Sequence, residues 1–128
     1  MKQLGILGRI FFALPFGIMG LNHFLMRDYF LGIMSSFIPG GLYTILLTGA
    51  LLIAASVSIM LNKNLKIVCF GLAGLLLIFI LSIHIPGLFD PKNAQTALIE
   101  LLKDTALMGA SLLLALTSDN KEETTSKK

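Results

Sequence analysis

Residues Leu42–Leu61 form a run of 20 consecutive residues that contains no charged side chain. As an α-helix, a run of this length is about 30 Å long, which matches the hydrocarbon core of a lipid bilayer. A soluble domain of 128 residues has too small an interior to hide such a helix, together with other apolar runs, on every side. The run therefore predicts a membrane-spanning helix.

The composition of the whole chain also favours a lipid environment. Hydrophobic residues make up 55% of the chain and charged residues only 13%, whereas soluble domains are about 25% charged. The mean hydropathy is +0.86. The basic residues lie at the ends of the apolar runs, where they can anchor helices at lipid headgroups. The net charge of +3 is therefore not a sign of nucleic-acid binding, and we expect no nucleic-acid partner.

The order of the apolar runs predicts four membrane spans in a single domain over residues 1–117. We expect the spans at about Leu4–Met26, Leu42–Leu61, Ile67–Ile85 and Ala94–Thr117. The fold class is then all-α, an integral membrane four-helix bundle with up-down-up-down topology. Residues 118–128 contain no apolar side chain, and they predict a polar, disordered cytoplasmic tail.

Prolines and glycines predict where the helices bend or end. Pro15 should kink the first span, and Ile85-Pro86-Gly87 should end the third span, because the residue before a proline avoids the helical conformation. Residues 27–41 are apolar but short, and they end in Pro39-Gly40-Gly41. We expect a short interfacial or re-entrant segment there, with Tyr29, Phe30, Ile33, Met34 and Phe37 on one side of a short helix.

The distribution of Lys and Arg predicts the orientation in the membrane. An even number of spans places both termini on the same side, together with the turn between the second and third spans. Seven Lys and Arg residues lie on that side and three on the other. Because basic residues concentrate on the cytoplasmic side, we expect a multi-pass protein of the cell membrane with both termini cytoplasmic.

Small residues at four-residue spacing predict where helices approach one another. Ala13 and Gly17 form such a pair on the first span, and Ala50, Ala54 and Ser58 form a row on the second. Helices that lack bulky side chains on one face can bring their backbones close together. The two faces are therefore the predicted contact surfaces.

Polar and ionisable side chains gather near the outer ends of the predicted spans. On the fourth span, Glu100, Lys103 and Asp104 share one face with Thr96, Leu107 and Ser111. Charged groups at membrane depth are costly when they face lipid, so we expect this stripe to point inward, toward His23 and, as a second neighbour, His84. The predicted polar pocket comprises His23, Asn22, Arg9, His84, Glu100, Lys103 and Asp104.

Six of these seven residues also have a purely structural interpretation. The three charged residues of the fourth span can be headgroup-level anchors that pair with one another. Arg9 can be a cytoplasmic anchor whose charged end reaches water, and His84 can be an interfacial residue at a helix end. His23 fits a buried, hydrogen-bonded histidine as well as it fits a functional group. A carboxylate beside a histidine can move protons, so we also consider His23 and Asp104 as an acid–base pair.

Several kinds of site are disfavoured. The chain has two histidines, whereas a two-haem four-helix cytochrome needs four, so we do not expect haem. The Glu-x-x-His pairs of a di-iron centre are absent, and we expect no metal site. Glycine-rich phosphate loops and nucleophile motifs are also absent. A lone cysteine, Cys69, cannot form an intramolecular disulfide, and we expect a small buried side chain there.

Four short motifs occur in order along the chain. They are Gly20-Leu-Asn-His23-Phe24, Phe37-Ile38-Pro39, Leu47-Thr48-Gly49 and Leu102-Lys103-Asp104-Thr105-Ala106-Leu107-Met108-Gly109. Together they resemble DoxX-like membrane proteins, which carry Gly-x-x-His-Phe at the end of the first span and a proline in the following connector. That family often carries Lys-Asp followed by Gly in the fourth span. The resemblance covers about Gly5 to Leu116.

The resemblance implies a small four-helix membrane bundle and draws attention to His23, Lys103 and Asp104. Some DoxX-like proteins are subunits of quinone-linked oxidoreductases. The resemblance therefore implies an accessory membrane subunit rather than a stand-alone enzyme, with quinone as the cofactor to expect and a redox protein as a partner besides the lipid bilayer. Self-association into an oligomer is compatible with it. Two alternatives stay open: a binding or scaffold protein for a lipid or a partner protein without chemistry, and a small transporter.

Overall fold

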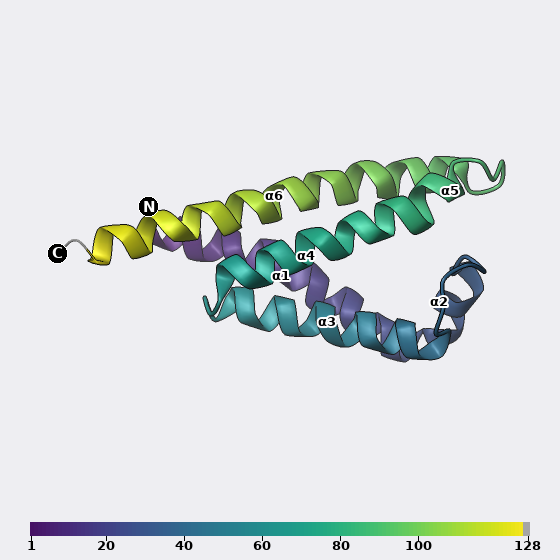
Figure 1. The fold of residues 1–128 in the computed structure, drawn as a ribbon, viewed down its shortest axis with the longest axis horizontal. Helices are drawn as coiled ribbons and strands as arrows, with labels where there is room; N and C mark the ends of the chain where they lie inside the picture. The colour runs from purple at the N-terminus through teal and green to yellow at the C-terminus, as the bar shows by residue number, and fades with distance from the viewer. Residues whose placement is uncertain (127–128) are drawn as a thin grey trace. The chain divides into compact units, whose positions relative to one another are not determined.

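The computed structural model describes the backbone of residues 1–126 and the side chains of residues 1–118. This part of the chain is all-helical and contains no strand. The elements are α1 (Lys2–Leu25), α2 (Arg27–Ile33), α3 (Leu42–Met60), α4 (Leu65–Phe79), a π-helical turn η1 (Ile80–His84), α5 (Ile85–Gly87) and α6 (Ala94–Ser126) (Figure 1). The chain divides into two compact units, Met1–Asn64 and Leu65–Lys128.

Three helical segments are long and apolar enough to cross a membrane. They are Lys2–Leu25, Leu42–Met60 and Leu65–Gly87, the last of which combines α4, η1 and α5. They coincide with the first three predicted spans, whereas the fourth predicted span lies in α6, which is not among them. Large apolar side chains on these segments are exposed, including Phe11 at 65% and Ile67 at 76%. This combination indicates a membrane protein.

In the first unit, α1 packs against α3 at a pair of glycines. A Cβ atom built onto Gly20 would lie 2.7 Å from the Gly49 carbonyl oxygen, and one built onto Gly49 would lie 2.8 Å from the Gly20 carbonyl oxygen. The backbones meet so closely that neither position has room for a side chain. Nearby, the buried Ser56 hydroxyl donates a hydrogen bond to the Ala13 carbonyl oxygen at 2.8 Å. A Cβ on Gly17 would also meet Ser56, which confirms the predicted contact surface of the first span.

The predicted contact surface of the second span is wrong. Ala50 and Ala54 are exposed, and Ser58 is half-buried. The residues of α3 that are buried instead are Ile45, Gly49, Leu52, Ser56 and Ile59. Gly49 permits the closest approach to α1, so the contact face follows the glycine. It is rotated by about one residue, or roughly 100°, from the row of small residues that we expected.

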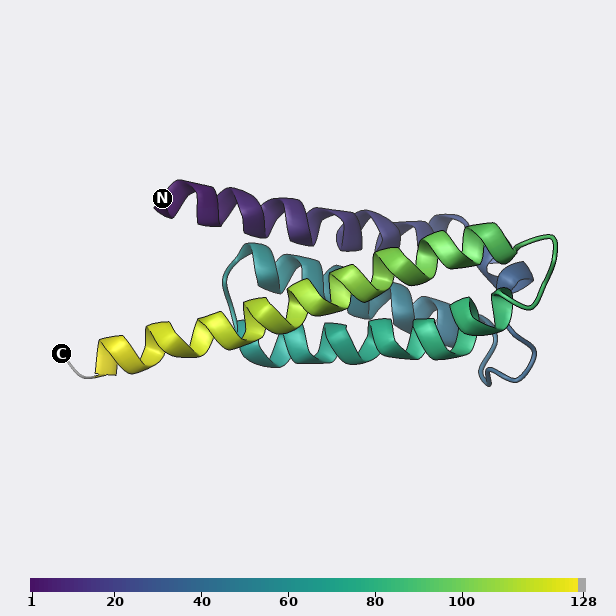
Figure 2. The same cartoon turned by 90° about the horizontal axis from the view of Figure 1, so that it is seen from above.

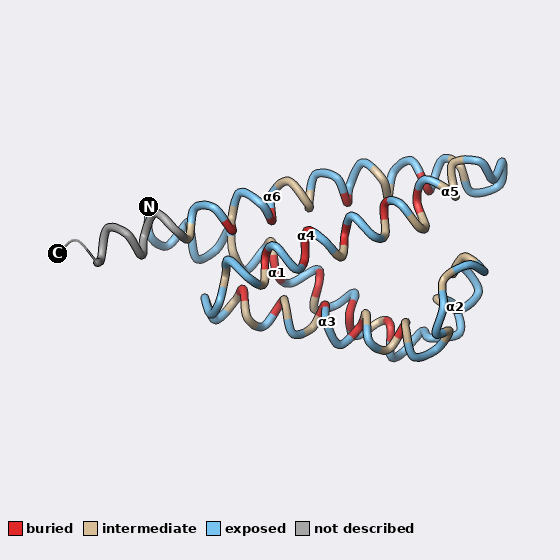
Figure 3. The backbone as a smooth tube through the Cα atoms, viewed as in Figure 1, coloured by how far each residue is buried: buried red, intermediate tan, exposed pale blue. Residues whose placement is uncertain are grey.

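In the second unit, α4 and α6 lie side by side and run in opposite directions (Figure 1, Figure 2). Their buried residues face one another, as the red segments of these two helices show (Figure 3). Cys69 is fully buried, as expected of a small side chain inside an apolar run. The buried Ser111 hydroxyl of α6 donates a hydrogen bond to the Cys69 carbonyl oxygen at 2.8 Å. One serine hydroxyl thus links the helices of this pair, as Ser56 does in the first unit.

The third predicted span ends at Gly87, within the Ile85-Pro86-Gly87 sequence that was predicted to stop it. Ile85 itself is helical, with φ −62° and ψ −49°, so the expected reason for the stop is wrong. The Ile85 N–H donates to the Ile80 carbonyl oxygen, five residues back, which makes η1 a wider π turn. A proline lacks an N–H, and in a regular α-helix its ring would clash with the carbonyl four residues earlier. The wide turn relieves this conflict, and Pro86 then lies in the first turn of α5, where the missing donor costs nothing.

The connector over residues 27–41 is only partly helical. The helix α2 ends at Ile33, so Met34 and Phe37 lie beyond it rather than on its face. Tyr29 and Phe37 are 58% and 65% exposed. These exposed aromatic side chains suit the membrane interface, although the interfacial position itself stays a prediction.

Helix α6 is longer than expected. It continues to Ser126, so the backbone of residues 118–126 is helical where the sequence predicts a disordered tail. Lys and Glu, which occur in this segment, are good helix formers, and extending an existing helix avoids the cost of nucleation. Residues 127–128 of the predicted tail lie outside the described residues.

Candidate polar site

A histidine and an aspartate form a buried pair between the third predicted span and α6. His84 is the last residue of η1, and its Nε2 atom lies 2.8 Å from Asp104 Oδ2 on α6. The two side chains are only 11% and 7% exposed. An Nε2–H group can donate to the carboxylate, so each side chain provides a partner that the other needs inside an apolar helix pair.

Two further charged side chains of α6 complete a cluster with this pair. Lys103 forms an ion pair with Glu100, and its Nζ atom lies 3.5 Å from Asp104 Oδ1. The side chains of Lys103 and Glu100 are 42% and 39% exposed. Asp104 therefore has different partners at its two oxygens, His84 at Oδ2 and Lys103 at Oδ1. We call His84, Glu100, Lys103 and Asp104 the α6 cluster.

Helical spacing explains why these groups meet. Glu100 and Asp104 are four residues apart on α6, and side chains at this spacing lie on the same face of a helix. Asp104 and Ser111, seven residues apart, are both buried on the face toward α4, whereas Thr96 is exposed. The predicted inward stripe is therefore confirmed at Asp104 and Ser111, which are buried. It is wrong at Thr96 and Lys103, which are exposed, and Glu100 and Leu107 are half-buried.

The cluster also contains a set of metal-binding atom types. One donor atom from each of His84, Glu100 and Asp104 lies within 4.8 Å of the other two. The prediction of no metal site considered only Glu-x-x-His pairs on a single helix. Here the histidine comes from η1 and the carboxylates from α6. The spacing of Glu100 and Asp104 could be read from the sequence. The approach of His84 from η1 could not be read from it.

His23 lies in the first unit and has local partners. Its Nδ1 atom is 2.8 Å from the Met19 carbonyl oxygen, and its ring stacks on Phe30 with centroids 4.0 Å apart. The residue is 8% exposed. These contacts support the structural interpretation of His23 as a buried, hydrogen-bonded histidine. A shared pocket of His23 and Asp104 stays a prediction.

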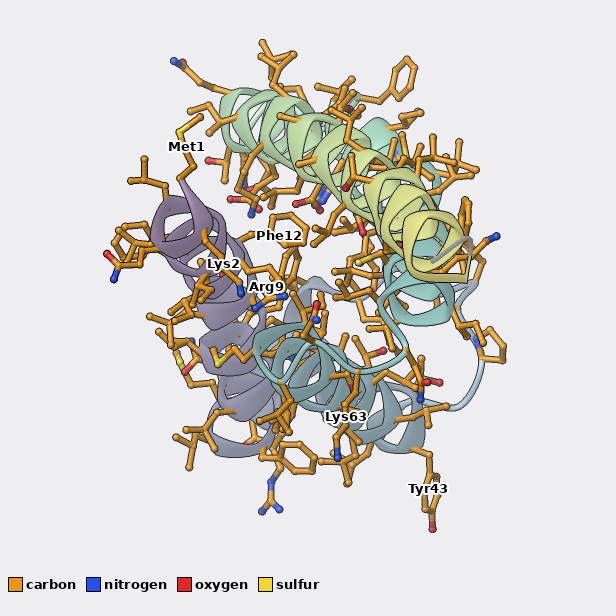
Figure 4. The ribbon with its side chains drawn as sticks, turned by 90° about the vertical axis from the view of Figure 1, so that its left-hand side faces the viewer. Met1, Lys2, Arg9, Phe12, Tyr43 and Lys63 are labelled. Carbon is orange, nitrogen blue, oxygen red and sulfur yellow. The ribbon has the colours of Figure 1, made fainter. Side chains whose placement is uncertain are left out.

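Arg9 and Asn22 also belong to the first unit. Arg9 donates a hydrogen bond to the side chain of Asn62, in the turn that follows α3, and Figure 4 shows Arg9 on α1 at this end. Arg9 and His23 are 14 positions apart on α1, which corresponds to about 21 Å along a helix. Arg9 therefore contacts the turn and does not share a pocket with His23. Asn22 is half-buried, and its backbone carbonyl accepts the Met26 N–H at 2.7 Å.

The structure thus brings together four of the seven predicted site residues, namely the α6 cluster. Such a cluster can exchange a proton between imidazole and carboxylate, and it can hold a cation between its carboxylates. Comparisons with protein-family models, with curated proteins and with solved structures find no match to this chain. The resemblance to DoxX-like proteins therefore continues to depend on the motifs alone.

Proposed function

We propose that this protein is a small four-span membrane subunit of DoxX type that works with a redox partner at a membrane-soluble quinone. The observation that carries the proposal is the buried His84–Asp104 hydrogen bond of 2.8 Å at the end of an apolar helix. Reduction of a quinone to a quinol takes up two electrons and two protons. The partner protein supplies the electrons, and the His84–Asp104 pair passes protons to the quinone oxygens as a positioned acid–base group.

In this proposal α6 is the fourth span of a four-helix bundle. The uncharged stretch over residues 105–118 is about 21 Å long as a helix, which is too short to cross the hydrocarbon core alone. The turn that carries Glu100, Lys103 and Asp104 then lies within the membrane or close to its headgroups. The pairing inside the α6 cluster supports this depth, because paired charges are less costly there than isolated ones.

The proposed orientation, with both termini cytoplasmic, can be tested by labelling with a thiol reagent that does not cross membranes. In a Cys69→Ala background, we expect a single cysteine at Asn93 to react in intact cells and one at Ser126 to stay unmodified until the cells are opened. The reason is the seven-to-three distribution of Lys and Arg across the predicted loops. The reverse labelling pattern would contradict the topology.

The quinone proposal can be tested by purifying the protein from its native membranes in mild detergent and extracting the bound molecules. We expect mass spectrometry to find a quinone with the wild-type protein. Asp104→Asn and His84→Gln should each weaken its retention by about 10- to 100-fold, because a hydrogen bond to a charged group contributes about 1.5–3 kcal/mol. Asp28→Asn, which changes an exposed carboxylate on α2, is the matched control and should retain the quinone.

Other outcomes of the same purification favour the alternatives. A tightly held lipid or partner protein without quinone would favour a binding or scaffold role. Proton-driven or substrate-driven flux in reconstituted vesicles would favour a small transporter. Either result in the wild-type protein would overturn the quinone proposal.

A further inference from the structure

We propose that His84, Glu100 and Asp104 form a binding site for a divalent first-row transition-metal ion, with Zn²⁺ as the best-fitting ion. In the metal-free state Lys103 occupies the position between the carboxylates, and the metal displaces it. This proposal does not rest on quinone binding, although both involve the α6 cluster.

The donor set suits such an ion. Imidazole nitrogen favours zinc, iron and copper, whereas carboxylate oxygen also accepts harder ions, and a mixed set favours Zn²⁺, Fe²⁺ or Mn²⁺. In a tetrahedral zinc site with bonds of about 2.1 Å, neighbouring donors are roughly 3.4 Å apart. The three donor atoms already lie within 4.8 Å of one another. Glu100 and Lys103 are partly exposed, so Glu100 has room to rotate toward the ion and Lys103 to turn away from it.

The charges of the cluster favour a divalent cation. Two carboxylates and one ammonium leave one negative charge unbalanced when His84 is neutral. A divalent ion that replaces Lys103 balances both carboxylates, and neutral His84 then binds through Nε2 with its proton on Nδ1. An unbalanced charge is costly where side chains are as buried as Asp104, at 7% exposure. The exchange therefore removes an electrostatic cost that the metal-free cluster retains.

Lys103 can leave without unfolding the helix pair. Its side chain is 42% exposed, and its contacts with Glu100 and Asp104 are on its own helix. A long, flexible ammonium side chain can turn toward water or headgroups while its backbone stays helical. His84 and Asp104 stay fixed by the packing of η1 against α6. Three protein ligands then leave one position of a tetrahedral ion open for water or another ligand.

The test is a titration of the full-length protein, purified in detergent without a histidine tag and freed of metal with a chelator. We expect Co²⁺ to bind with one equivalent, to give the visible absorption of a tetrahedral cobalt site, and to be displaced by Zn²⁺. Glu100→Gln should weaken Co²⁺ binding by more than the roughly 10–100-fold loss that removal of an outer-shell partner causes. Asp28→Asn is the control and should bind Co²⁺ as the wild-type protein does.

Lys103→Met separates a metal site from a purely structural cluster. Removal of the competing ammonium should tighten Co²⁺ binding by about two- to five-fold, the scale expected for a half-exposed ion pair. A variant that merely disturbed the fold would weaken binding instead. The proposal is overturned if the wild-type protein binds no stoichiometric Co²⁺, or if Lys103→Met fails to tighten it. Cobalt binding without retained quinone would support this site and overturn the proposed function. Retained quinone without cobalt binding would support the proposed function and overturn this site.

Discussion

Gly20→Ala is expected to destabilise the protein by about 1–3 kcal/mol, the usual cost of overpacking a well-packed contact. The added Cβ would lie 2.7 Å from the Gly49 carbonyl oxygen and 3.0 Å from the Ile53 backbone nitrogen. Backbone atoms cannot rotate away, so α1 and α3 would have to separate. The free energy of unfolding can be measured by titrating the purified protein in mixed micelles with a denaturing detergent and following its helicity.

Gly71→Ala provides the matched control, since nothing lies within 4 Å of a Cβ built onto this glycine of α4. Here alanine should be neutral or stabilising by up to about 1 kcal/mol, because it reduces the conformational freedom of the unfolded chain. A similar loss of stability in both variants would show that glycines matter for general helix flexibility. In that case the close contact between α1 and α3 would not be the cause.

The second large effect is expected at the buried pair of the α6 cluster. Asp104→Asn and His84→Gln should each destabilise the protein by about 1.5–3 kcal/mol, the worth of a buried hydrogen bond to a charged group. The first substitution removes the charge of the acceptor, and the second removes the imidazole that bonds to it. The double variant should cost less than the sum of the two, since the shared interaction can be lost only once. A coupling energy of about 0.5–3 kcal/mol is typical of residues in direct contact.

Two further double-mutant cycles act as controls. Ser111 lies seven positions beyond Asp104 on α6 and bonds to the Cys69 carbonyl instead, so Ser111→Ala and His84→Gln should be additive.

The cycle of His23→Gln with Asp104→Asn tests the acid–base pair that the sequence suggested. Additive effects there would end that hypothesis, and additive effects of His84→Gln and Asp104→Asn would contradict the assignment of the buried pair.

The helices that could be predicted from the sequence are those with long uncharged runs. Such runs locate α1, α3 and α4 to within a few residues, because the length of an apolar run and its charged ends depend only on the order of residues. The contact face of α3 was harder to predict from the sequence. Ala50 and Ala54 resemble a packing row, but Gly49 permits a closer approach to α1, and the choice between the two rows depends on the partner helix.

The candidate site was predicted in part for a similar reason. The shared face of Glu100, Lys103 and Asp104 follows from helical spacing within α6, and their pairing was among the expected interpretations. Helical spacing within α6 could not identify the histidine that pairs with Asp104. From the sequence, His23 was preferred to His84 as the partner of Asp104. The sequence does not show directly which helices pack together or how an irregular turn rotates a side chain.

The π turn before Pro86 has a consequence for insertions and deletions in this helix. In a regular α-helix Ile83 would lie in line with Leu76, seven residues earlier, and His84 would lie roughly 80–100° away from that line. The wide turn absorbs about one extra residue, so Leu76, Ile80 and His84 are all buried, whereas Ile83 is half-buried. A related chain with one residue fewer in this turn could present its imidazole from an unbroken α-helix on the same face. The distance in sequence from the apolar core to the histidine can therefore differ by one between proteins that share the same site.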